Sequence, residues 1–211
     1  MKDSGDRPLA AQVTISGSSE IRYLDMGSGN PVLVLQATLE NALVDQLSRH
    51  FRVIAFDLCG PRDPVDVAKA VAETADRLAV TSYCLIGESE LAASAVAHAI
   101  DFSERVEALI LVAPTTSPTV AGDTSQGAAA DLRLEEIHAP TLALFGTRDE
   151  MGCESGRAYA RRIANCFYTL VYDSGHDIAR DRPQALCAVV SDFLEHREKF
   201  VLGHESSVIN P

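Results

Sequence analysis

The chain has 211 residues, of which 46% are hydrophobic and 23% are charged. This composition predicts a single globular domain with its own hydrophobic core and argues against a disordered chain. The 18 basic and 30 acidic residues leave a net charge of −12, which disfavours nucleic acid and anionic membranes as partners.

The N-terminal part of the chain predicts a tail followed by a β-hairpin. Residues 1–10 predict a flexible tail, and the polar start at 1–8 lacks the apolar run of a signal peptide. Between 11 and 26, apolar and polar residues alternate on both sides of the turn-forming segment 17–19, as the strands of a hairpin do. The 5 cysteines are scattered and form no CxxC pair, so we expect free thiols and a cytoplasmic location.

From residue 31 onward, short apolar strands alternate with helices. Strands are expected at 31–35, 51–56, 83–86, 108–112, 141–145 and 167–172. Helices are expected at 39–50, 63–80, 90–102, 154–164 and 182–199. Apolar strands joined by helices are typical of a parallel sheet covered on both faces, so the pattern predicts an α/β fold. We expect a mostly parallel, doubly wound sheet of about eight strands, with the antiparallel hairpin at one edge.

These elements define one domain over residues 11–200. Within it, 115–138 is the one long connection, with a small helix expected at 131–137, and 201–211 predicts a C-terminal tail. The sequence has neither the glycine triplet of a dinucleotide-binding fold nor a phosphate-binding P-loop. A nucleotide-binding module is therefore disfavoured, although a doubly wound sheet could host one.

Functional groups in such a sheet gather at the carboxyl ends of the strands, where three segments carry suitable residues. The first segment, GESEL at 87–91, lies between a strand and a helix. A serine on a sharp strand-to-helix turn exposes its hydroxyl beside a helix N-terminus, which favours a nucleophile and its oxyanion. Ser89 is therefore a candidate nucleophile. The alternative is that Ser89 only caps the helix, as serine often does.

The second and third segments supply an acid and a base. Asp149 follows the strand at 141–145, and His176 follows the strand at 167–172. Histidine is the usual general base near neutral pH, and a carboxylate can orient it. Taken singly, either residue could belong to an ordinary surface turn. Together with Ser89 they follow the chain order of α/β-hydrolases, which makes the set far more specific than its members.

The chain resembles α/β-hydrolase-fold proteins from about residue 11 to residue 200. The resemblance rests on the segments IRYLDMG (21–27), VIAFDLCG (53–60), LIGES (85–89), SERV (103–106), GTRD (146–149) and GH (175–176). It implies that Ser89 is the nucleophile, His176 the general base and Asp149 the carboxylate that orients it. It also implies hydrolysis of carboxylic esters or related acyl compounds through an acyl-enzyme. Neither a metal nor an organic cofactor is implied.

Two departures from the family's pattern bear on the oxyanion site. The backbone N–H of Glu90, which follows the candidate nucleophile, is the first expected donor. The family usually has His-Gly where this chain has Gln36 and Ala37, and the resemblance implies that the second donor is the N–H of Thr38. Leu91 stands where the family has a small glycine, so it either pushes the helix outward or lines the pocket.

The substrate site is expected to include Gln36, Glu88, Leu91 and Thr115. The helical lid of the family is reduced here to the segment 115–138. The site is therefore expected to be open, or to be covered by that loop or by the partner subunit of a homodimer. Acidic residues crowd the site, so we expect a small neutral or cationic substrate over an anionic one.

A second interpretation is a protein of this fold with weak or lost hydrolase activity that serves as a binding module. The altered oxyanion segment and the replaced glycine motivate it. Lyase, cyclase and carbon–carbon bond chemistry also stay open, because the fold hosts many reactions. A serine at position 89 argues against relatives of the epoxide-hydrolase and haloalkane-dehalogenase type, in which the resemblance implies an aspartate nucleophile.

Overall fold

The computed structural model describes residues 12–16, 19–36, 41–58, 63–116, 133–200 and 208–209. Nine strands in these ranges form one sheet in the order β1-β2-β4-β3-β5-β6-β7-β8-β9. The strands are β1 (Gln12–Ser16), β2 (Ser19–Met26), β3 (Pro31–Gln36), β4 (Arg52–Asp57), β5 (Tyr83–Glu88), β6 (Val106–Val112), β7 (Thr141–Gly146), β8 (Cys166–Val171) and β9 (Val208–Ile209).

The six central strands, in the order β4-β3-β5-β6-β7-β8, run parallel to one another, and antiparallel strands flank this group on both sides. At one side, β2 pairs antiparallel with both β1 and β4. This confirms the predicted mostly parallel sheet with an N-terminal hairpin at its edge. At the other side, β9 pairs antiparallel with β8. The sequence predicted a tail over 201–211, because two apolar residues are too few to show the alternation that marks a strand.

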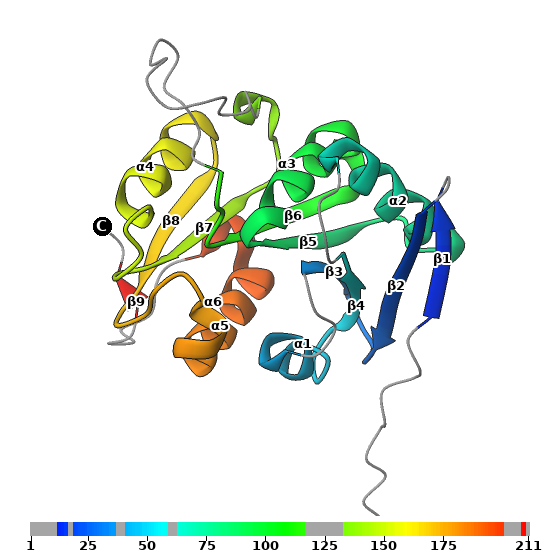
Figure 1. Cartoon of the computed structure of the whole chain (residues 1–211), viewed down its shortest axis with the longest axis horizontal. Coiled ribbons are helices and arrows are strands. Elements are labelled where there is room, and N and C mark those ends of the chain that lie inside the picture. The colour runs from blue at the N-terminus through cyan, green and yellow to red at the C-terminus, as the bar shows by residue number, and fades with distance from the viewer. Residues whose placement is uncertain are drawn as a thin grey trace, which may run out of the picture.

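Helices cover both faces of the sheet (Figure 1). The α-helices of the described residues are α1 (Ala42–Leu47), α2 (Pro64–Arg77), α3 (Ala92–Asp101), α4 (Gly152–Arg162), α5 (Ile178–Asp181) and α6 (Pro183–His196). One face carries α2, α3 and α4, and the other carries α1, α5 and α6 (Figure 1). Successive strand residues point into the two cores, so that Leu33 and Leu85 belong to one hydrophobic cluster and Val34 and Ile86 to the other. The predicted doubly wound α/β architecture is therefore confirmed.

Several helix bounds differ from the expected ones, and α5 was not predicted. α1 is shorter than the predicted 39–50, because the Asn41 side chain caps it at Ala42 and a turn follows Leu47. The helix expected from residue 90 begins instead as a short 3-10 helix, η1 (Ser89–Leu91), before α3. The 3-10 helix η3 (Leu134–Glu136) lies within the small helix expected at 131–137. The stretch 117–132 lies outside the described residues.

A buried polar pair ties β5 to the helices of one face. The hydroxyl of Tyr83 lies 2.6 Å from Nε2 of His98, and Nδ1 of His98 lies 2.8 Å from the carbonyl oxygen of Ala68. A carbonyl can only accept, so Nδ1 carries the proton and Nε2 accepts from the tyrosine. Burial lowers the pKa of His98 to about 4, which keeps the imidazole neutral near pH 7. His98 therefore has a structural role.

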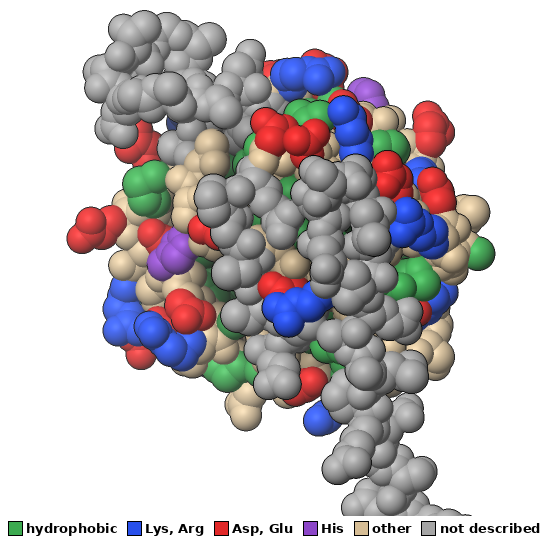
Figure 2. All heavy atoms as spheres, turned by 45° about the vertical axis from the view of Figure 1, so that its right-hand side comes forward, with side chains coloured by type: hydrophobic (Ala, Val, Ile, Leu, Met, Phe, Trp, Pro, Cys, Tyr) green, Lys and Arg blue, Asp and Glu red, His purple; other side chains and the backbone are tan. Residues whose placement is uncertain are grey.

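The surface carries both signs of charge. Figure 2 shows acidic and basic side chains interspersed on the face that it displays. In the part of the chain that the structure describes, we find no helix long and apolar enough to cross a membrane.

Candidate active site

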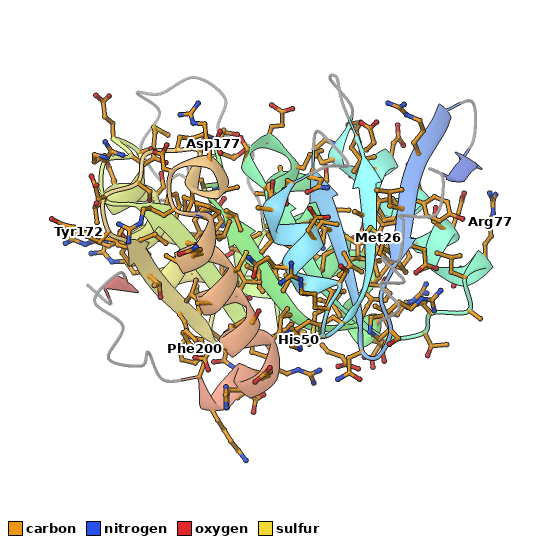
Figure 3. All side chains as sticks on the ribbon, turned by 90° about the horizontal axis from the view of Figure 1, so that it is seen from below. Met26, His50, Arg77, Tyr172, Asp177 and Phe200 are labelled. Atoms are coloured by element: carbon orange, nitrogen blue, oxygen red, sulfur yellow. The ribbon has the colours of Figure 1, made fainter. Side chains whose placement is uncertain are left out.

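The three candidate residues lie just beyond the carboxyl ends of β5, β7 and β8. Ser89 directly follows β5, Asp149 lies in the loop after β7, and His176 lies in the loop between β8 and α5. Asp177, the neighbour of His176, lies toward the upper side of the molecule in Figure 3, whereas His50, just before β4, lies toward the lower side. Because the strands are parallel, their carboxyl ends meet at one edge of the sheet.

The side chains of Ser89, His176 and Asp149 form a chain of hydrogen bonds. Oγ of Ser89 lies 2.9 Å from Nε2 of His176, and Nδ1 of His176 lies 3.1 Å from Oδ2 of Asp149. An ionised carboxylate only accepts, so Nδ1 donates to Asp149 and Nε2 is left to accept the serine proton. The Asp149 side chain is 7% exposed and that of His176 46%. This arrangement can move a proton from the serine hydroxyl to the imidazole and hold the resulting cation.

Ser89 occupies a strained backbone conformation that exposes its hydroxyl. Its φ is +53°, in the left-handed region that non-glycine residues rarely adopt. Such strain persists only where the surrounding structure imposes it, and it clusters at functional sites. Gly87 permits the turn, because a Cβ there would lie 2.6 Å from the Cβ of Ala95 in α3. The close packing of α3 on β5 thus fixes the turn on which Ser89 stands.

The loops that carry Asp149 and His176 approach each other through their backbones. The N–H of Thr147 donates to the carbonyl of Val171, and the N–H of Arg148 to the carbonyl of Ser174. A Cβ on Gly146 would lie 2.2 Å from the carbonyl oxygen of Gly175, a distance that no side chain tolerates. The glycine therefore allows the contact that places the carboxylate beside the imidazole.

Further hydrogen bonds fix the carboxylate and the histidine loop. Oδ1 of Asp149 accepts from the N–H of Met151 at 3.1 Å, which orients Oδ2 toward the imidazole. Oδ2 of Asp181 accepts from the N–H of Gly175 at 2.8 Å and from the Arg148 guanidinium at 3.4 Å. These bonds, with that from the Gly175 N–H as the largest cause, lower the pKa of Asp181. The histidine loop is therefore held from both sides.

A polar cluster lies directly before Ser89. The amide nitrogen of Asn41 lies 2.8 Å from Oε1 of Gln36 and 3.3 Å and 3.5 Å from the two carboxyl oxygens of Glu88. Burial raises the pKa of Glu88 to about 7, the hydrogen bond from Asn41 opposes this rise, and the charge of Asp177 adds to it. The sequence analysis missed Asn41 because it placed the start of the helix at residue 39. An asparagine before an apolar helix is a known cap signal and could have been noticed.

The remaining predicted residues lie at different depths around the site. Gln36 is buried at the carboxyl end of β3, and Leu91 is 5% exposed and packs in a hydrophobic cluster. Leu91 thus offers little surface to a substrate. Glu90 is exposed in η1, and the N–H of exposed Thr115 lies 3.4 Å from the carbonyl oxygen of Ser89. Thr38, expected to supply the second oxyanion donor, lies outside the described residues.

The described residues contain no group of three or more His, Cys, Asp or Glu side chains that could hold a metal ion. Cys84, Cys166 and Cys187 are free thiols, and burial raises the pKa of Cys84 and of Cys187 to about 11.

Comparison with solved structures identifies the fold. No family model matches the sequence, and no curated protein matches it. Carboxylesterase CesB from Bacillus subtilis superposes with a TM-score of 0.72 at 16% identity, covering 89% of this chain and 92% of that chain. Naproxen esterase from Bacillus subtilis gives 0.74 at 13% identity with the same coverage. Epoxide hydrolase CorEH gives 0.72 at 15% identity, covering 88% and 98%. The chain therefore has the α/β-hydrolase fold.

The contact between the two loops predicts unequal effects of two neighbouring glycine substitutions. Gly146→Ala should destabilise the protein by about 2 kcal/mol and weaken the Asp149–His176 contact, because the new Cβ overlaps the facing backbone. Gly175→Ala is the matched control, since its Cβ would meet only Oδ2 of Asp181 at an ordinary 3.5 Å. Urea denaturation measures the free energy of unfolding of both variants. Equal stability of Gly146→Ala and the unaltered protein would contradict the prediction.

Proposed function

We propose that this protein is a serine hydrolase that acts on carboxylic esters or related acyl compounds. In this proposal Ser89 is the nucleophile, His176 the general base and Asp149 the carboxylate that orients the imidazole. The observation that carries it is the chain of hydrogen bonds of 2.9 Å and 3.1 Å through these side chains. The left-handed backbone of Ser89 at a strand-to-helix turn supports it independently.

The proposed reaction has two halves that use the same three side chains. His176 takes the proton of Ser89 as its oxygen attacks the carbonyl carbon, and a tetrahedral oxyanion forms. The backbone N–H groups of Glu90 and Thr38 are the proposed donors to that oxyanion. His176 then gives its proton to the leaving alcohol, which departs and leaves an acyl group on Ser89. Water then attacks the acyl carbon as His176 takes its proton, and His176 returns that proton to the serine oxygen as the ester bond to Ser89 breaks and the acid leaves.

The burial pattern supports a division of roles within the set. Asp149, nearly buried and with both carboxyl oxygens hydrogen-bonded, can hold the imidazole without moving. His176, with 46% of its side chain exposed, can meet a substrate and water directly. This exposure supports an accessible site suited to small or protruding acyl groups. The alternative, a binding module with weak or lost activity, would retain the geometry but lack turnover.

A substrate of neutral or positive charge is the second part of the proposal. The carboxyl groups of Glu88 and Asp177 lie close enough to influence each other beside Ser89. A negatively charged substrate would approach these groups against repulsion, and a cationic one would be attracted. The same chemistry disfavours nucleic acid and anionic lipid as ligands.

Reaction with a fluorophosphonate probe tests the nucleophile. The unaltered protein should be labelled on Ser89, and Ser89→Ala should not be labelled at all. Asp149→Asn should slow labelling by roughly 10³–10⁴-fold, because the imidazole loses the partner that fixes its tautomer. Ser48→Ala, which removes a serine hydroxyl that donates to the carbonyl of Asp45, serves as the control and should label normally. A protein that stays unlabelled at high probe concentration would favour the binding module.

Three aryl esters of equal size test the preferred charge of the substrate. One carries a neutral acyl group, one a quaternary ammonium and one a carboxylate. We expect kcat/KM for the anionic ester to be lower than for the other two by roughly tenfold at low ionic strength, with the gap narrowing in salt. The fastest turnover with the anionic ester would refute the proposed charge preference while leaving the nucleophile untouched.

A further inference from the structure

We propose that Asn41 is a positioning residue of this site, which acts on the chemistry of Ser89 through the carboxyl group of Glu88. Its hydrogen bond to Glu88 sets the pH at which a negative charge develops beside the nucleophile. The catalytic half of this inference rests on the proposed hydrolase function. The contact itself stands on the geometry of three side chains from three different elements.

Asn41 is held so that its amide can face only one way. Its Oδ1 accepts from the N–H groups of Leu43 at 2.8 Å and Val44 at 3.0 Å, at the start of α1. An amide that accepts with its oxygen on one side must present its NH₂ group on the other. That NH₂ group lies 2.8 Å from Oε1 of Gln36 and 3.3 Å from Oε1 of Glu88. The start of α1 therefore dictates a donor aimed at the carboxyl that precedes Ser89.

The surroundings of Glu88 make its charge sensitive to that donor. Burial disfavours the ionised carboxyl, and the negative charge of Asp177 at the start of α5 disfavours it further. Gln36 on β3 and Asn41 on α1 are uncharged. The other acidic groups on the neighbouring elements include Glu90, exposed in η1, Asp45, exposed in the first turn of α1, and Asp57, which pairs with Arg22. The hydrogen bond from Asn41 favours the ionised form of Glu88, because an N–H group stabilises the carboxylate that accepts from it.

The charge on Glu88 matters because Ser89 is the next residue. Attack by the serine oxygen develops a negative charge on the substrate carbonyl near the first turn after β5. A neutral Glu88 leaves this charge unopposed, whereas an ionised Glu88 adds a like charge close by. Loss of a proton from Glu88 should therefore slow acylation. A fall of roughly tenfold in kcat/KM is expected across that titration.

The substitution Asn41→Ser removes the NH₂ donor to Glu88 but keeps the cap of α1. A serine hydroxyl caps a helix about as well as an asparagine side chain, but it has no NH₂ group to reach Glu88. The variant should lose only the stability contributed by the hydrogen bond to buried Gln36, while the midpoint of the Glu88 titration rises by about half a pH unit or more. Asp63→Ser is the matched control, because Asp63 caps α2 in the same way through the N–H groups of Val65 and Asp66. It should leave the titration unchanged.

Two readouts decide the inference. The first is the ¹³C NMR titration of the Glu88 carboxyl, assigned by its absence in Glu88→Gln. The second is the pH dependence of kcat/KM for a neutral ester, whose alkaline fall should move upward with the NMR midpoint in Asn41→Ser and vanish in Glu88→Gln.

An unshifted NMR midpoint in Asn41→Ser would overturn the role of Asn41. A shifted midpoint with an unchanged alkaline fall in rate would overturn the link to Ser89. Absence of hydrolysis at every pH would instead overturn the proposed function and with it the catalytic half of the inference. The NMR titration would still decide on the contact between Asn41 and Glu88.

Discussion

The parallel alignment of β3, β5, β6, β7 and β8 is the constraint on which the site depends. These strands are largely buried and run in the same direction, so their carboxyl ends all lie at one edge of the sheet. Residues that are 87 and 27 positions apart in the chain meet there as hydrogen-bonded neighbours. The two hydrophobic cores hold the strands in register, and the loops at that edge carry the candidate site residues.

Close backbone approach converts this alignment into a geometry that can react. At Gly87 a helix packs against the strand, and at Gly146 one loop lies against another, both closer than a side chain would allow. The first approach imposes the left-handed turn at Ser89, and the second brings Asp149 to His176. Hydrogen bonds from Met151 to Asp149 and from Gly175 to Asp181 then fix the carboxylate and the histidine loop. Packing in the core thereby orients the three side chains at the carboxyl edge of the sheet.

Much of this was readable in the sequence, because buried parallel strands leave long apolar runs. Those runs predicted the α/β sheet, and the residues after them predicted the positions of Ser89, Asp149 and His176. The cap residue Asn41 escaped notice, since its partners Gln36 and Glu88 are distant in sequence and only the fold brings them together. Leu91 was open between two roles, and only packing shows that it belongs to the core. The strand-to-helix turn at Ser89 was predicted from the local segment GESEL, and the structure adds its left-handed backbone and the close contact of α3 with β5.

The central claim is that Ser89 forms a covalent acyl intermediate by means of His176 and Asp149. The most direct measurement is the mass of the intact protein while it turns over a chromogenic ester, followed by peptide mapping of the adduct. The protein should gain the mass of one acyl group transiently, on the peptide that carries Ser89, and His176→Ala should show no such gain. Release of the chromophore with no acylated protein, or with the acyl group on another residue, would contradict it.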